Sequence, residues 1–313
     1  MGLESTRNQD YSVLFHLSVT ILNFKGIKMS DSHIKFIYLL VVIGTLLFSC
    51  RPKNIDLEVE PAVSKLVVFT QVIPDNIMIV TLTKSFSALE NPENSMANLL
   101  VSGAVVKITS NNITYNFYEL NPGVYASYSV AAFEPGQSFD LFAAAYGDTV
   151  TSTSTMLEKA VFTSVVPNVE KLPTDTTVYL DFTFNDFPNT PNWYLLNIYK
   201  KSMTAGPIFD ASSLFDNGSN YLIKSMLVSD KEFNGTYHKN LELENTLYND
   251  SIVVTLSNIS EKYFNFLGYS LGNGGVFSQL NIEPLNYPTN IVNGYGFFNT
   301  NIPDVHYFDL SQY

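Results

Sequence analysis

Charged residues are scarce in this sequence, and basic ones most of all. Only 15% of the 313 residues are charged, and 17 Lys and Arg stand against 29 Asp and Glu. An acidic surface repels nucleic acid, so we predict that nucleic acid is not a partner. The chain is instead 46% hydrophobic and 14% aromatic, which is enough for a sizeable core and typical of a β-rich extracytoplasmic protein.

Cysteine is almost absent, because Cys50 is the only one. The chain therefore has no internal disulfide. Cys50 follows an uncharged apolar run of 13 residues, 36–48. This run is too short to span a bilayer and is typical of the hydrophobic region of a signal peptide.

The run ends in Leu47, Phe48 and Ser49, directly before Cys50. This tetrapeptide resembles a bacterial lipobox, with an aliphatic residue three positions before the cysteine and a small one next to it. In lipoproteins of this type the cysteine is acylated and the preceding peptide is removed. We therefore predict that Cys50 carries a lipid anchor of two or three acyl chains, which suffices for stable attachment. The alternative is a signal peptide that happens to contain a buried cysteine.

Cleavage before the acylated Cys50 removes the first 49 residues from the mature protein. Residues 29–49 alone form a complete lipoprotein signal, so we expect translation to begin at Met29 and residues 1–28 to be an upstream extension. Translation from Met1 is the alternative. Loss of residues 1–49 removes four of the 17 basic and three of the 29 acidic residues, which leaves 13 and 26 and a net charge of −13.

From residue 65 onward, β-branched segments with two-residue alternation recur between turn signals. Residues 50–60 precede them as a short tether. We predict a mainly β chain: an N-terminal immunoglobulin- or transthyretin-like β-sandwich over residues 61–166, then a second β-rich domain over 167–313. The predicted strands are 65–72, 77–83, 104–109, 114–120, 124–130, 138–146, 177–184, 193–200, 221–228, 237–243 and 251–256.

One short helix is predicted near residues 258–271 of the second domain. Its apolar residues recur at intervals of three and four from Ile259 to Leu271. Asn258 is the expected N-cap, and Gly272 is expected to end the helix.

Residues 268–272, Gly-Tyr-Ser-Leu-Gly, match the G-x-S-x-G pattern of α/β-hydrolases, and Asp304 and His306 follow in the order that those enzymes use. That motif needs a turn from a strand into a helix within a parallel sheet, whereas Ser270 falls near the end of the predicted helix. A serine esterase at Ser270 is therefore a remote alternative. We predict that the chain is not an enzyme and has no cofactor.

Other chemical candidates are weak. His238 and His306 are far apart, so a zinc site has little support. Residues 216–218, Asp-Asn-Gly, begin like a calcium loop but lack its later ligands. Trp193, Tyr194 and Tyr199 lie on one predicted strand and either stack on a sugar or are partly buried on both faces; we favour burial.

Several stretches together resemble a Bacteroidota lipoprotein family catalogued as domain of unknown function 4249. Its acidic tether and first strand correspond to residues 55–58 and 65–73, and its helix to "ISEKYFNFL". Its ending corresponds to "EPLNYPTNIVNGYGFFNT", residues 283–300. Further segments correspond to residues 101–108, 122–125, 135–141 and 230–235.

The residues of that ending also indicate a structural role. Asn293, Gly294 and Gly296 tolerate positive φ, and Phe297 and Phe298 supply a closing edge strand. We expect this ending to dock onto the second domain.

The resemblance implies an accessory surface lipoprotein without known catalytic residues, of the kind often encoded beside TonB-dependent transporters. We therefore expect an outer-membrane, lipid-anchored protein at the cell surface, whose partner is a TonB-dependent or other β-barrel protein. The alternative function is a surface module that captures a glycan, a peptide or another nutrient. Three sites also resemble the Asp-Ser/Thr-aliphatic acceptor of O-glycosylation systems in Bacteroidota, namely Thr149, Thr176 and Ser251.

Overall fold

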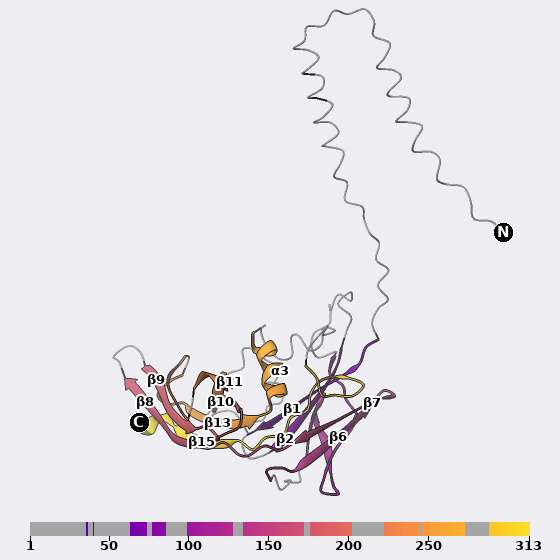
Figure 1. Cartoon of the computed structure of the whole chain (residues 1–313), viewed down its shortest axis with the longest axis horizontal. Coiled ribbons are helices and arrows are strands. Elements are labelled where there is room, and N and C mark those ends of the chain that lie inside the picture. The colour runs from indigo at the N-terminus through magenta and orange to yellow at the C-terminus, as the bar shows by residue number, and fades with distance from the viewer. Residues whose placement is uncertain are drawn as a thin grey trace, which may run out of the picture. The chain divides into compact units, whose positions relative to one another are not determined.

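The computed structural model describes residues 36, 40, 63–73, 77–85, 99–127, 134–171, 176–201, 222–233, 235–244, 246–272 and 288–313. Residues Glu60–Tyr313 form one compact unit. Within it the described residues are mainly β, with three sheets and one short α-helix near the C-terminal region, as the sequence predicts (Figure 1).

An eight-stranded sheet forms the first part of this unit, in the order β14-β1-β2-β5-β4-β3-β6-β7. Tight turns connect several neighbours: Asn111 and Asn112, with φ of 49° and 61°, join β3 to β4, because asparagine tolerates the left-handed region that such hairpins need. The strands are β1 (Leu66–Ile73), β2 (Ile77–Lys84), β3 (Val105–Ser110), β4 (Ile113–Asn121), β5 (Val124–Ala126), β6 (Ser138–Ala145), β7 (Asp148–Thr155) and β14 (Tyr295–Phe297).

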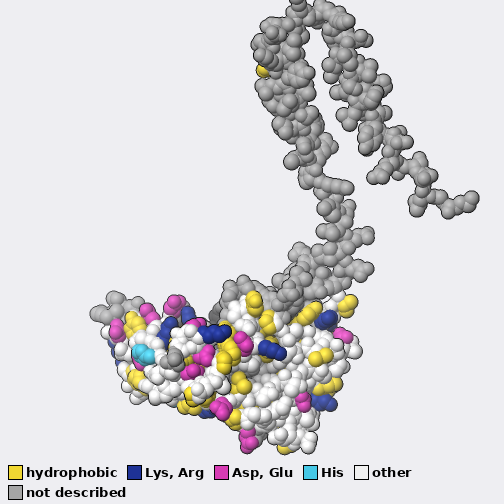
Figure 2. All heavy atoms as spheres, in the orientation of Figure 1, with side chains coloured by type: hydrophobic (Ala, Val, Ile, Leu, Met, Phe, Trp, Pro, Cys, Tyr) yellow, Lys and Arg dark blue, Asp and Glu magenta, His cyan; other side chains and the backbone are white. Residues whose placement is uncertain are grey.

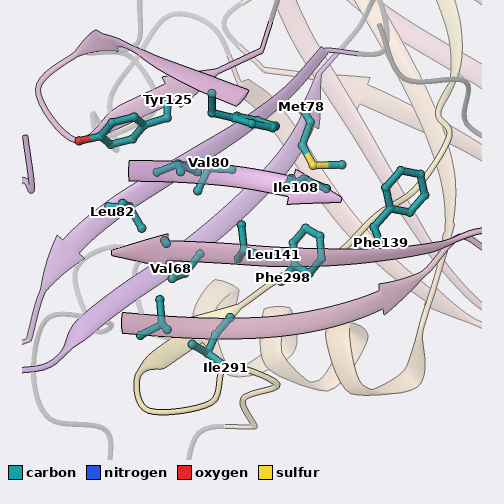
Figure 3. Packing of buried hydrophobic residues seen from close by; sticks show 14 of the residues in the cluster. Val68, Met78, Val80, Leu82, Ile108, Tyr125, Phe139, Leu141, Ile291 and Phe298 are labelled. Carbon is teal, nitrogen blue, oxygen red and sulfur yellow. The ribbon is translucent and has the colours of Figure 1, made fainter. Parts of the chain in front are cut away.

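This sheet folds over on itself to enclose a core, and we call it the first sandwich. Strand β4 pairs with β3 up to Phe117 and with β5 from Tyr118 onward, and the register of its pairing with β5 shifts between Glu119 and Asn121. The enclosed side chains are mostly aliphatic. Figure 3 shows Val68, Leu141 and Phe298, from three distant parts of the chain, directed into this interior.

Residues 288–301, which we call the closing segment, contact both edges of the first sandwich. Strand β14 pairs in parallel with Val67–Phe69 of β1. On the other side, the Val292 amide donates to the Thr151 carbonyl of β7 at 2.8 Å, and the Thr151 amide donates back at 3.4 Å. The expectation of a closing edge strand is confirmed. The expectation that it docks onto the second domain holds only in part: its backbone partners lie on β1 and β7, whereas the Phe297 ring packs against Tyr263 and Phe266 of α3 (Glu261–Gly272).

Two glycines allow this close approach. Gly296 has φ of 94°, and a Cβ there would overlap the Val68 carbonyl oxygen. At Gly294 a Cβ would lie 2.5 Å from the Leu66 carbonyl oxygen and 2.7 Å from Cγ1 of Val150. Asn293 takes the predicted positive φ, at 64°.

The remaining strands form a second sandwich, with a four-stranded sheet in the order β11-β10-β13-β15 and a three-stranded sheet in the order β12-β9-β8. Alternate residues of β9 are buried, as expected of a strand with one face toward the core. The strands are β8 (Phe162–Lys171), β9 (Thr176–Asn185), β10 (Trp193–Lys201), β11 (Leu222–Ser229), β12 (Thr236–Leu243), β13 (Ser251–Ile259) and β15 (Asp304–Asp309). Strand β8 passes through Pro167, the first residue of the predicted second domain; the division into domains at residue 166 stays a prediction.

A third apolar cluster joins the two sandwiches, and we call it the bridging cluster. Val67 and Phe69 of β1 and Leu195 of β10 pack there against α3 (Glu261–Gly272), which lies over β10 and β11 (Figure 1). A hydrogen bond from Asn301 Nδ2 to Ser257 Oγ, 2.7 Å long, also joins the closing segment to β13. Strands β1 and β13 are therefore buried on both faces.

The helix prediction needs one correction, at its start. Residues 258 and 259 belong to β13, and Ser260 instead precedes α3, where its Oγ accepts from the Tyr263 amide at 3.3 Å. Asn258 is therefore not the N-cap. Strands β7, β8 and β15 were not predicted from the sequence. Most of the other strands were predicted. The described residues also contain two 3-10 turns, η4 (Asp230–Glu232) and η5 (Leu310–Gln312).

Candidate functional site

The predicted anchor lies outside the described residues, and so do its lipobox positions Leu47, Phe48 and Ser49 and the acylation site Cys50. The Asp-Asn-Gly stretch 216–218 lies outside them as well. Among the described residues, no helix is both long and apolar enough to cross a membrane.

The three residues of the esterase hypothesis are not brought together. Asp304 and His306 on β15 lie opposite Leu256 and Val254 of β13, whose side chains belong to the core of the second sandwich. Directly opposed residues project to the same face of a sheet. Helix α3, which contains Ser270, packs on the other face of that sheet, in the bridging cluster. The sheet therefore separates Ser270 from the other two residues.

Asp304 has a structural environment of its own. Its Oδ2 accepts the Phe162 amide at 3.0 Å and contacts His306 Nε2 at 3.1 Å, while Lys159 Nζ lies 3.1 Å from Oδ1. Burial alone would raise the pKa of Asp304, but these hydrogen bonds and the Lys159 charge outweigh it and lower the pKa. An ionised Asp304 thus ties β15 to the segment that precedes β8.

His238 lies on the outer face of the three-stranded sheet, with its side chain 60% exposed. Its Nε2 is 2.9 Å from Oδ2 of Asp181. Among the described residues no three His, Cys, Asp or Glu side chains are grouped as a metal site would require. His238 is a solvated strand residue in this structure.

The aromatic residues of β10 are largely internal. Tyr194, Leu196 and Ile198 are fully buried in the second core, whereas Trp193 and Leu195 face the bridging cluster. The predicted alternation of the two faces is confirmed, and burial on both faces is what we favoured. The geometry gives no flat, exposed stacking surface on this strand.

Sequence reasoning missed an open depression at one end of the second sandwich. Asn192 organises it: its side-chain amide donates to Asp186 Oδ1 at 3.3 Å, and its backbone amide donates to Asp230 Oδ2 at 2.9 Å. The buried Tyr194 hydroxyl donates to the same Asp186 oxygen at 2.6 Å. The lining residues are Asp186, Asn189, Thr190, Pro191, Asp230, Lys231, Glu232 and Phe233.

The chemistry of this depression combines fixed carboxylates with one aromatic ring. Burial, followed by the hydrogen bond to Asp186, raises the pKa of Tyr194, so its hydroxyl remains a donor. Phe233 packs edge-on against Phe184, with ring centres 5.7 Å apart. The available signal in the sequence was the stretch 185–192, whose two prolines mark a loop between the predicted strands 177–184 and 193–200.

The three candidate glycosylation sites differ in accessibility. Thr149, near the start of β7, is exposed. Thr176 and Ser251 are half-buried at the first positions of β9 and β13. Modification itself stays a prediction, and Thr149 is the most accessible of the three.

Comparison with protein families gives one match. The family model described as Domain of unknown function (DUF4249) matches residues 52–301, which covers most of the chain and every described strand except β15. A search of curated proteins finds no match.

Proposed function

The chain belongs to the DUF4249 family, and we propose that it is an outer-membrane lipoprotein, anchored through Cys50, that serves as a non-catalytic accessory subunit of a TonB-dependent transporter or another β-barrel protein. One observation carries the proposal. The apolar run 36–48 ends in a lipobox-like tetrapeptide, and the family match begins at residue 52, two positions after the cysteine. A folded unit that directly follows an acylation signal is suited to a position at a membrane surface.

The described surface supports an interaction role. Figure 2 shows hydrophobic side chains interspersed with acidic and basic ones over the visible face. The two sandwiches share the bridging cluster, so together they present a broad, preformed scaffold. Preformed surfaces bind partners without the entropic cost of ordering a flexible segment.

The decisive experiment compares the wild-type chain with Cys50→Ser in the native host. Outer membranes are extracted in mild detergent, the tagged chain is purified, and the Cys50 peptide and co-eluting proteins are identified by mass spectrometry. We expect an acylated Cys50 peptide and a stoichiometric β-barrel protein, both lost in Cys50→Ser. Ser49→Ala is the matched control, because it keeps a small residue before the cysteine. A soluble protein with an unmodified Cys50 would disprove the proposal.

A second candidate function is capture of a glycan or peptide, and the depression around Asn192 favours it. Carboxylates bind sugar hydroxyls and peptide amines, and Phe233 supplies apolar surface beside them. A thermal-shift screen against glycans and peptides tests this candidate. A shift that disappears in Asp186→Ala but persists in Asp181→Ala, on the outer face of the same sheet, would support it. A screen without any shift would count against it.

We further propose that the chain has no esterase activity at Ser270. The separation of α3 from Asp304 and His306 by the four-stranded sheet supports this proposal. An ester panel measured with wild-type and Ser270→Ala protein tests it. Activity that falls in the variant would contradict it.

A further inference from the structure

The chain enters the first sandwich at a fixed position. Ser64 Oγ donates to the Ser85 carbonyl at 2.6 Å, and the Ser85 amide donates to the Lys65 carbonyl at 2.9 Å. Leu66, the first residue of β1, lies opposite Lys84, the last residue of β2. We call this end of the first sandwich the tether end, because the segment from Cys50 arrives there.

Four large apolar side chains are exposed around the tether end, among charged neighbours such as Glu119 and Asp148. Val105, Tyr118, Leu120 and Tyr146 are 60%, 55%, 42% and 65% exposed. Tyr146 belongs to this end because Lys84 Nζ lies 3.8 Å from the centre of its ring.

Val105, Tyr118 and Leu120 are placed at the same end by Glu119. Its carboxylate accepts the Gly103 amide at 2.8 Å and the Gly123 amide at 3.3 Å. The Leu82 amide donates in turn to the Gly123 carbonyl at 2.8 Å, close to Lys84 on β2.

The described residues at the opposite end of the same sandwich are mostly polar. The turn at Asn111 and Asn112 lies there, and Gln137 Nε2 donates to Ser110 Oγ at 2.8 Å. Ile113 is the large apolar side chain exposed among them, at 55%. The two ends of one strand, β4, therefore face different surroundings.

We propose that the tether end rests on the lipid bilayer, at the boundary between headgroups and acyl chains. The proposal builds on the Cys50 anchor proposed above. Tyrosine is enriched at this boundary because its ring is apolar and its hydroxyl polar, and a lysine beside it keeps its charge in the headgroup layer. Lys84 on Tyr146 and Lys65 on Tyr295, 5.2 Å from the ring centre, are pairs of this kind.

The length of the tether permits this contact. Fourteen sequence positions separate Cys50 from Ser64. Fully extended they span about 50 Å, so the anchor allows the tether end to reach the bilayer and does not force it there. The exposed apolar side chains at that end stabilise the contact, because the bilayer removes them from water. A lipid surface is the occupant that fits, because the anchor holds a bilayer next to this end of the sandwich.

The two ends of β4 provide a matched test. Cys50 is the only cysteine, and acylation blocks it, so an introduced cysteine is the only free thiol. Leu120→Cys and Ile113→Cys place a thiol-reactive environment-sensitive fluorophore at opposite ends of one strand, about 23 Å apart along it. The acylated full-length mature protein is reconstituted in vesicles of phosphatidylethanolamine with a minor share of phosphatidylglycerol. Emission and quenching by lipid-borne and aqueous quenchers are recorded.

We expect the label at position 120 to shift to shorter wavelength and to be quenched from the lipid. The label at position 113 should behave as in water. Hydrogen exchange of the unlabelled acylated protein provides a second measurement that is independent of any substitution. The amides of residues 119–121 and 123 should gain protection in vesicles relative to the Cys50→Ser protein in buffer without vesicles, and those of residues 110–113 should not.

Three results would overturn the proposal, and they are distinguishable. If the protein is acylated and vesicle-bound but both labels remain in water, the anchor stands and the bilayer contact is wrong. If the label at position 120 is shielded only in native outer membranes, a protein covers the tether end instead. If mass spectrometry finds Cys50 unmodified in the native host, the anchor fails and the contact fails with it.

Discussion

The two sandwiches reach a closed core by different means. The first encloses mostly aliphatic side chains and is completed by the closing segment, which comes from the far end of the chain. The second encloses a network of rings, in which Phe184 lies 4.9 Å from Tyr194 and 5.1 Å from Tyr237 between ring centres. Close backbone contacts therefore limit which substitutions the first sandwich tolerates, and the volume of the buried rings limits those that the second tolerates.

This difference has a consequence for how each half responds to change. A strand inserted beside β1 and next to β7 tolerates no added atom where its backbone meets theirs, whatever the hydrophobicity of the new side chain. A ring network instead tolerates small shifts but not the loss of a ring, because the neighbouring rings cannot fill the space.

The largest effect is expected at Gly296 in the closing segment. Gly296→Ala should lower the free energy of unfolding by roughly 4 to 6 kcal/mol, because it combines strain at positive φ with overlap against the Val68 backbone. Chemical denaturation followed by the fluorescence of Trp193, which faces the bridging cluster, measures it. Gly136→Ala is the control: its φ is 81°, but a Cβ there meets nothing within 4 Å. It should lose only about 1–2 kcal/mol. Equal losses in the two variants would show that close approach is not what limits the first sandwich.

In the second sandwich, Phe184→Ala should lower the free energy of unfolding by about 3–5 kcal/mol. Its ring is fully buried and contacts Tyr194, Phe233 and Tyr237. Near-ultraviolet circular dichroism should also lose tyrosine signal, since two of these neighbours are tyrosines. Val166→Ala, on the outer face of β8 and 49% exposed, is the control and should change little. A retained tyrosine signal would indicate that the rings pack independently.

Within the second sandwich, the attachment of β15 to Phe162 and Lys159 should depend on pH through Asp304. Because its pKa is lowered in the folded protein, the ionised carboxylate stabilises the fold above the unfolded pKa of about 3.9, and this contribution disappears as pH falls through the lower folded pKa. Asp304→Asn should therefore be less stable by about 1–3 kcal/mol at neutral pH, with a difference that shrinks in acid. Urea titrations at several pH values measure it. A difference that is constant with pH would contradict the role of the charge.

Much of the fold was predictable because its strands carry local signals. The alternation in β9 and β10 and the Asn111-Asn112 turn each follow from a few neighbouring residues. Strand β7 was missed because its sequence, DTVTSTST, is almost entirely Ser and Thr, so its single strongly apolar residue, Val150, gives no period. The backbone pairing of the closing segment with β1 was not predicted, because pairing between residues more than 200 positions apart leaves no local pattern.

The candidate sites show the same limit. The sequence shows Asp304 and His306 two positions apart, but only the structure shows that both lie on β15 and that α3 lies on the opposite face of its sheet. The depression around Asn192 joins residues 186–192 to residues 230–233. Each stretch alone resembles an ordinary turn, so the site exists only once β10 and β11 are paired.

The smallest effect is expected on the outer face of the second sandwich, at His238. His238→Ala should change the free energy of unfolding by less than about 0.5 kcal/mol, because both members of the His238–Asp181 pair are well exposed and such pairs contribute little. Thermal denaturation measures it, with Tyr237→Ala as the control: this neighbour on β12 points inward at Phe184 and should lose far more. A loss at His238 similar to that at Tyr237 would mean that this face is not simply solvated, and the search for a partner surface would then begin there.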